Sequence, residues 1–321
     1  MPRNPRFRSS IRTEEHHGLT FRIRLEDNSI MPPLQVIKPA GQAIFLGHSL
    51  KLPSQFKPPQ GNTAQDHYKQ AWKSGDLGAT PQLIPPWFMP AEAGNKYYQD
   101  SCDKIGNDFK SFHDKMLDAV VYAHTKWKAL AKFQDLKINA VIALGTPGCL
   151  DGGELESDIK NAPMAASMSG NMAKHRDAVA KGVSKCFKDW QDKVTVPGLP
   201  WYPAFAAFPG PMAPPMPNVP MPLITCVSAM MSKIIMPSDM KSAMDDALDG
   251  GLKDKDPDKQ YEALHDAIAT VLAASFAIWL AAQQVIGVLG KGPIPTFAPP
   301  YVPVGPVVMG DNLAIPGHLA L

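Results

Sequence analysis

The longest hydrophobic pattern of the chain lies in its second hundred residues. Its apolar side chains recur in steps of three and four: Tyr98, Cys102, Ile105, Phe109, Phe112, Met116, Ala119, Ala123, Trp127 and Leu130. This spacing predicts an amphipathic helix, and we interpret its aromatic stripe as core rather than as a cofactor site. Taken over residues 96–136, the helix would be roughly 60 Å long. We expect so long a rod to pack on a second helix or on a symmetry-related copy.

A shorter helical pattern follows the glycine-rich turn at residues 145–153. Its apolar side chains lie on one side: Met172, Val179, Val183, Cys186 and Trp190. Its lysines lie on the other: Lys174, Lys181, Lys185 and Lys188. The lysines are typical of a solvated surface. The two patterns together define a predicted helical region at residues 93–192.

A third helical region is predicted at residues 238–292. It begins with a helix capped by Ser238 and stopped at Gly250, and it resumes at Asp256 with Pro257 in the first turn. From Ala267 to Leu289 there is no charge in 23 residues, which is long enough to span a bilayer. Its small residues, its two glutamines and the lack of flanking anchors argue against a span.

We therefore expect the apolar helix at residues 267–289 to be buried in a bundle or on an oligomer axis. Its alanines, Ala274 among them, would then allow close packing against protein. Insertion into a bilayer is the alternative.

The N-terminal region, residues 1–92, has a different pattern. Leu19, Phe21, Ile23 and Leu25 alternate with polar residues, which predicts a strand with one buried face. Four arginines precede it, and we interpret them as an arm that grips a neighbouring subunit, with a nucleic-acid arm as the alternative. Prolines punctuate residues 31–90, which predicts edge strands, turns and surface loops.

Proline dominates two further segments. Ten prolines lie between Thr195 and Leu223, interleaved with aromatic and methionine side chains. We expect neither helix nor strand ladder there, and we interpret residues 193–237 as a belt that lies on another protein surface. Residues 293–321 repeat this chemistry, so an extended tail is predicted. The expected fold class is therefore mainly α, with an N-terminal β or extended region, long amphipathic helices and proline-rich extended arms.

Composition narrows the range of functions that the chain could have. The 321 residues include 33 prolines and 16 methionines, and methionine provides an adaptable apolar surface. The 32 basic and 30 acidic residues leave a net charge of +2, so no overall field recruits nucleic acid or an anionic membrane. The first residues lack the apolar segment of a secretory signal. We expect a cytoplasmic protein, or one that leaves the cytoplasm by another route.

The residues that could carry chemistry do not form a recognisable site. Cysteines at 102, 149, 186 and 226 contain no CxxC pair, and nucleotide, hydrolase and zinc-protease motifs are absent. Cys149, with a base from His124, His175 or His265, could form a cysteine hydrolase, but a buried inert thiol is the commoner case. We therefore predict no enzyme and no catalytic or cofactor-binding residue.

No metal site is predicted either. Residues 245–256 partly match a calcium loop, but Ala247 occupies its third position and no glutamate closes it. We interpret these residues as a polar turn between helices. The adjacent His16 and His17 are too close in sequence to converge on a metal without further ligands.

Three segments carry a resemblance: Ile138–Ile159, Gly170–Leu223 and Gly290–Leu319. They resemble a family of structural proteins from bacterial phage-tail-like contractile injection systems, over about the C-terminal two thirds of the chain. The resemblance implies a particle assembled in the cytoplasm, cyclic symmetry, no cofactor and no catalytic residues.

The resulting hypothesis is a non-catalytic structural subunit of such a particle, in a cap, plug, tube or baseplate position. Its partners would be other subunits and copies of itself, with no small-molecule substrate and no nucleic acid. The particle would be released from the cell or docked at a membrane. The alternative is a membrane-associated adaptor or pore-forming component that uses the helix at residues 267–289.

Overall fold

The computed structural model describes residues 34–50, 96–201, 212–256, 258–295, 297–298, 302–303 and 306–319. All of them belong to the compact unit Met31–Leu321. The strand predicted at residues 19–25, the basic arm and the aromatic residues Tyr202, Phe205 and Phe208 of the predicted belt lie outside the described residues.

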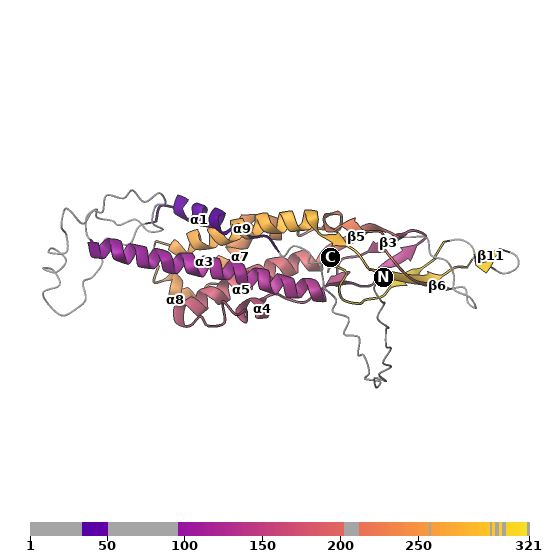
Figure 1. Cartoon of the computed structure of the whole chain (residues 1–321), viewed down its shortest axis with the longest axis horizontal. Helices are drawn as coiled ribbons and strands as arrows, with labels where there is room; N and C mark the ends of the chain where they lie inside the picture. Colours follow the sequence, from indigo (N-terminus) through magenta and orange to yellow (C-terminus); the bar gives the residue numbers. More distant parts are fainter. Residues whose placement is uncertain are drawn as a thin grey trace, which may run out of the picture. The chain divides into compact units, whose positions relative to one another are not determined.

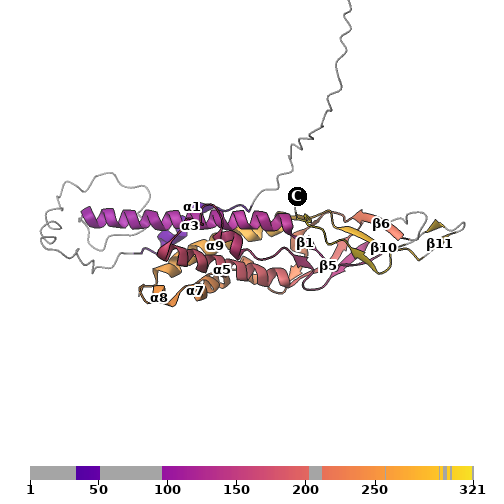
Figure 2. The same ribbon diagram turned by 90° about the horizontal axis from the view of Figure 1, so that it is seen from below.

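The helices are α1 (Lys38–Gly47), α3 (Lys96–Leu130), α4 (Glu156–Lys160), α5 (Gly170–Asp192), α6 (Ser232–Ile235), α7 (Pro237–Ala247), α8 (Gly250–Lys253) and α9 (Gln260–Ala282), with a 3₁₀ turn at Leu223–Thr225. The strands are β1 (Lys132–Phe133), β2 (Lys137–Asn139), β3 (Ile142–Gly145), β4 (Leu150–Asp151), β5 (Val194–Pro200), β6 (Met212–Pro217), β7 (Met221–Pro222), β8 (Val227–Ser228), β9 (Gln284–Val285), β10 (Leu289–Pro293), β11 (Phe297–Ala298), β12 (Val302–Pro303) and β13 (Gly310–Asn312). Figure 1 and Figure 2 show α3, α5, α7 and α9 running side by side, with most strands beyond one end of them.

Helix α3 carries the predicted stripe. Its 35 residues span about 52 Å, and Phe112, Met116, Ala123 and Trp127 on its apolar face are buried. The helix ends at Leu130, six residues earlier than predicted, because the chain turns into β1. The helices α1, α4, α5 and α9 of the same chain pack against it, so the predicted second helix is present within the chain.

The prediction of edge strands, turns and loops at residues 31–90 is wrong for Lys38–Gly47, which form helix α1. Pro39 lies in its first turn, a position where the missing N–H costs nothing. Gly41 faces the ring of His113 on α3, and a Cβ at this position would lie 2.2 Å from the His113 Nε2 atom. The absence of a side chain therefore lets α1 lie directly on the other helices.

The fold class predicted from the sequence, mainly α, is wrong. The structure is mixed: of the described residues, 52% are helical and 19% are in strands. Seven strands form an antiparallel sheet in the order β6-β10-β13-β2-β3-β5-β8. The predicted belt at residues 193–237 supplies β5, β6 and β8 to this sheet, although no strand ladder was expected there.

The prolines are compatible with the sheet because of where they lie. Pro214, Pro215 and Pro217 are on β6, an edge strand with one neighbour, and Pro214 and Pro215 lie where its register with β10 shifts. Pro197 lies on β5 next to the point where the register with β3 shifts, between Ala143 and Gly145. Proline therefore marks edges and irregular positions here, rather than excluding strands.

The predicted C-terminal tail is part of the fold. Strand β13 pairs with β10 on one side and with β2 on the other. Asn312 accepts a hydrogen bond from the Leu136 N–H (2.9 Å) and donates one to the Phe133 carbonyl (2.7 Å). Leu319 is fully buried. These contacts fix residues 306–319 to the sheet and to the core.

The centre of the core is an aromatic cluster between α3, α5 and α9. It comprises Trp127, Phe187, Trp190, Phe276 and Trp279, all almost completely buried. The Trp127 indole N–H donates to the Gln191 amide oxygen at 2.6 Å. His124 lies in the same cluster, with its ring 4.5 Å from that of Trp279 between centroids. The cluster joins the three longest helices.

Helix α9 ends seven residues before the predicted apolar helix at residues 267–289 does. It starts at Gln260, and Asp256 caps it from outside by accepting the Tyr261 N–H at 3.0 Å. It ends at Ala282, because Gln283 has extended backbone angles and leads into β9. Among the described residues, α9 alone is long and apolar enough to cross a membrane, and 72% of its most apolar window is buried inside the chain.

Two details of this region differ from the predictions. The helix α7 begins at Pro237, one residue before the predicted cap Ser238, and Gly250 begins the short helix α8 instead of ending a helix. Within the single chain Ala274 is exposed on the surface of α9, so the close packing predicted for it does not come from the chain's own helices.

Candidate functional site

Cys149, the thiol considered as a nucleophile, is buried in this fold. Cys149 is 2% exposed, and its Sγ donates to the Val194 carbonyl at 3.4 Å. Burial raises the pKa of Cys149 to about 11, so the thiolate is scarce at neutral pH. Among the described residues no hydrogen bond joins Cys149 to a histidine. The structure therefore does not assemble the cysteine hydrolase that the sequence left open.

Residues 245–256, which partly match a calcium loop, form contacts between helices. Asp245 accepts hydrogen bonds from Lys241 (2.6 Å) and from the His265 Nδ1 (2.7 Å), which joins α7 to α9. Asp249 pairs with Lys174 of α5 at 3.2 Å. Within the described part of the chain, no group of three or more histidine, cysteine or acidic side chains could hold a metal ion.

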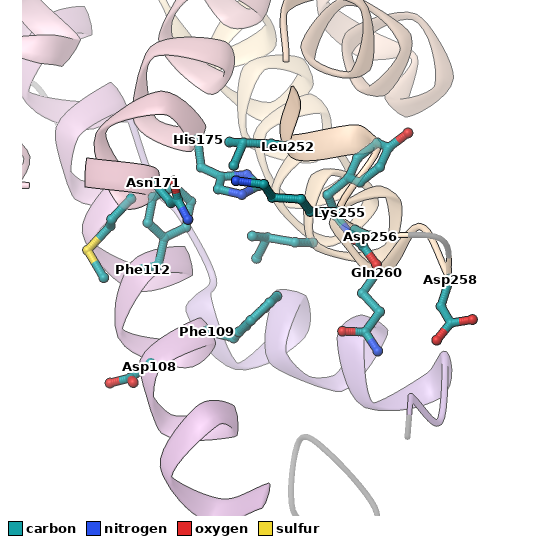
Figure 3. Close-up of a pocket in the computed structure, with 13 residues that line it drawn as sticks. Asp108, Phe109, Phe112, Asn171, His175, Leu252, Lys255, Asp256, Asp258 and Gln260 are labelled. Carbon is teal, nitrogen blue, oxygen red and sulfur yellow. The ribbon is translucent and has the colours of Figure 1, made fainter. Parts of the chain in front are cut away.

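One cavity could bind a ligand, and its side chains come from distant parts of the sequence. A cavity of about 360 Å³ lies between α3, α5, α8 and the start of α9 (Figure 3). Its lining residues are Asp108, Phe109, Phe112, Asn171, Met172, His175, Leu252, Lys255, Asp256, Asp258, Gln260, Tyr261 and Leu264. No motif in the sequence connects them, because each element contributes at most three residues.

His175 is the one histidine in the wall of this cavity. Burial lowers its pKa to about 4, and the neighbouring His265 contributes in the same direction. The two rings are 6.5 Å apart between centroids, and His265 is held from behind by Asp245. The Nδ1 atom of His175 and the Nε2 atom of His265 are buried without a hydrogen-bond partner. The imidazole that lines the cavity is therefore neutral at physiological pH.

A second region of interest is the outer face of the seven-stranded sheet. On β3, Ala143 points into the core, so Ile142 and Leu144 share the outer face, where they are 47% and 48% exposed. Val227 on β8, at the edge of the same half of the sheet, is 54% exposed. Together, Ile142, Leu144 and Val227 are called the outer-sheet patch below.

Charged side chains occupy the other half of that face. Lys137 on β2 forms an ion pair with Asp311 on β13 at 2.5 Å, and Asp311 lies opposite Lys291 of β10 in the ladder. A single residue on α9, Ile278, is also largely exposed, at 55%, beside the exposed Ala274 and Ala277. Isolated exposed apolar residues are common on proteins, whereas a cluster on one sheet face indicates a contact surface.

Comparison with known proteins does not assign the chain. Neither a family model, nor a curated protein, nor a solved structure matches it.

Proposed function

We propose that the chain is a non-catalytic structural subunit of a phage-tail-like contractile injection particle. The observation that carries the proposal is the outer-sheet patch, a cluster of half-exposed aliphatic side chains on a face that no described element of the chain covers. Burial of such a patch against another subunit is favourable by about 25 cal/mol per Å² of apolar surface. The resemblance of residues 138–159, 170–223 and 290–319 supports this class of particle.

The edges of the sheet favour contact through its face. The three prolines of β6 block strand addition at one edge, and β8 at the other edge has only two residues. A chain that joins neighbours by edge pairing would need a longer edge with free N–H groups. The proposed partners are other subunits of the particle and copies of this chain, assembled in the cytoplasm.

The inert thiols support a role without catalysis. Cys149, Cys186 and Cys226 are all buried, with pKa values raised to about 11, 11 and 12 by desolvation. The alternative role, as a membrane adaptor, would require α9 to leave the core. Phe276, Trp279 and Leu280 would then lose their packing, so we favour the structural role.

The outer-sheet patch can be tested with a matched pair of double variants. In Ile142→Lys with Leu144→Glu, the patch loses its apolar character, and the tagged chain should no longer sediment with particles purified from its native cells. The control is Ile224→Lys with Met236→Glu, which makes the same changes at residues that are 47% and 49% exposed but lie outside the sheet. Both double variants should melt within a few degrees of the unchanged chain.

Two results would count against the proposal. If particles assemble without this chain, and the tagged chain stays in the light fractions of a density gradient, the chain is not a subunit. If the Ile142 and Leu144 variant sediments with particles as the control does, the outer-sheet patch is not the contact surface. Immunoblots of the gradient fractions and negative-stain microscopy give both readouts.

A further inference from the structure

The cavity between α3 and the first turns of α5 and α9 is not used by the proposed structural role. Its volume of about 360 Å³ lies within the range of about 300–1,000 Å³ typical of small-molecule sites. Its walls come from the core helices α3, α5 and α9 and from α8, so the cavity is already formed in the folded chain. A preformed cavity needs no costly rearrangement before a ligand enters.

The walls are mainly aromatic and aliphatic. Phe112, Leu252, Tyr261 and Leu264 are buried in its walls, and the more exposed Met172 lies nearer the opening. The rings of Phe112 and His175 meet edge to face, 6.3 Å apart between centroids. Such walls favour a flat apolar body, and aromatic faces also attract cations.

The charges around the cavity are predominantly negative. Three carboxylates line it, those of Asp108, Asp256 and Asp258, against the single ammonium of Lys255. His175 adds no positive charge, because its imidazole is neutral. In Figure 3 Asp108 and Asp258 lie on opposite sides of the cavity, with Asp256 between the helix ends. A ligand that brings a positive charge is therefore favoured over one that brings a negative charge.

We infer that this cavity binds a small arylalkylamine, with the ring between Phe112, Leu252 and Leu264 and the aliphatic ammonium group near Asp256. The aliphatic and aromatic walls select the ring, and the carboxylates select the charge. The neutral imidazole of His175 offers a further hydrogen-bonding group in the wall without repelling the ligand.

Three probes of similar size separate these contributions: 2-phenylethylamine, its neutral analogue 2-phenylethanol, and the anion 3-phenylpropionate. Binding to the full chain is measured by saturation-transfer NMR and by titration. The amine should bind most tightly, and the anion should bind about tenfold or more weakly than the amine. Asp256→Asn removes the carboxylate but keeps an oxygen that can accept the Tyr261 N–H, so it should weaken amine binding about tenfold and leave phenylethanol binding unchanged.

The second test fills the opening of the cavity with a larger side chain. Met172→Trp places a large ring at the opening, so amine binding should fall below detection. The matched control is Met230→Trp, because Met172 and Met230 are 40% and 38% exposed and only Met172 lines the cavity. The inference fails if the anion binds as tightly as the amine. It also fails if Met172→Trp, folded as judged by circular dichroism, binds the amine like the control, or if the unchanged chain binds no amine at millimolar concentration.

Discussion

Acidification should unfold this protein through histidines that are buried in the neutral form. His124 is fully buried in the aromatic cluster, and neither of its ring nitrogens has a hydrogen-bond partner. His318 accepts the Phe133 N–H on its Nδ1 atom at 2.7 Å, which requires a neutral ring. Burial lowers the pKa of His124 to about 3 and those of His175 and His318 to about 4.

The direction and magnitude of the change in the free energy of unfolding follow from the linkage between folding and proton binding. Below about pH 6.5 the unfolded chain binds protons at these histidines that the folded chain excludes, so stability falls with falling pH toward the folded-state values of 4 and 3. At about pH 5 each histidine costs about 2 kcal/mol, and the three cost about 6 kcal/mol. This loss is comparable with the whole stability of a typical domain, about 5–15 kcal/mol.

The assay is urea unfolding, followed by circular dichroism at about pH 7.5 and about pH 5, in the unchanged chain and in His124→Phe. Phenylalanine keeps the ring in the aromatic cluster but cannot be protonated, so the pH dependence should shrink by about 2 kcal/mol. His48→Gln controls for the loss of an imidazole, because His48 lies at the surface beside Asp266. Equal pH dependence in His124→Phe and the unchanged chain would refute the reasoning.

Two further predictions concern burial. Burial raises the pKa values of Cys149, Cys186 and Cys226, so these thiols should resist iodoacetamide near neutral pH and react only in denaturant. Rapid labelling of the folded chain, detected by peptide mass spectrometry, would contradict this prediction. Ala273 is 1% exposed and Ala274 is exposed, so Ala273→Asp should cost at least about 3 kcal/mol of stability, whereas Ala274→Asp should change it by less than about 0.5 kcal/mol. Thermal melts of the two variants compare them directly, and equal destabilisation would mean that the exposed face of α9 is misassigned.

The helices α3 and α5 were predictable because their apolar residues repeat. The stripe from Phe112 to Trp127 gave α3 within a few residues, since every member of it had to face the core. The helix at residues 170–192 followed from the same argument. The end of α9 was missed because residues 284–289 remain apolar after the helix stops, so hydrophobicity alone carried no signal of the change to strands.

The sheet was not predictable by the same means. Its strands have two to seven residues, too short for an alternation to be recognised, and prolines interrupt β5 and β6. The candidate cavity was missed for another reason: Phe112 and Leu264 are 152 positions apart, and only the packing of α3 on α9 brings them together. Pocket residues that share no segment leave no local pattern.

The position of β13 has a consequence for synthesis in the cell. Residues 310–312 are synthesised after every other strand of this sheet, yet they separate β2 from β10 within it. Until they arrive, both neighbouring strands present unpaired backbone groups, and sheets completed by such distant segments form slowly. A nascent chain that already contains α3, α5 and α9 would therefore carry two open strand edges, and such edges are prone to aggregation until β13 fills the gap.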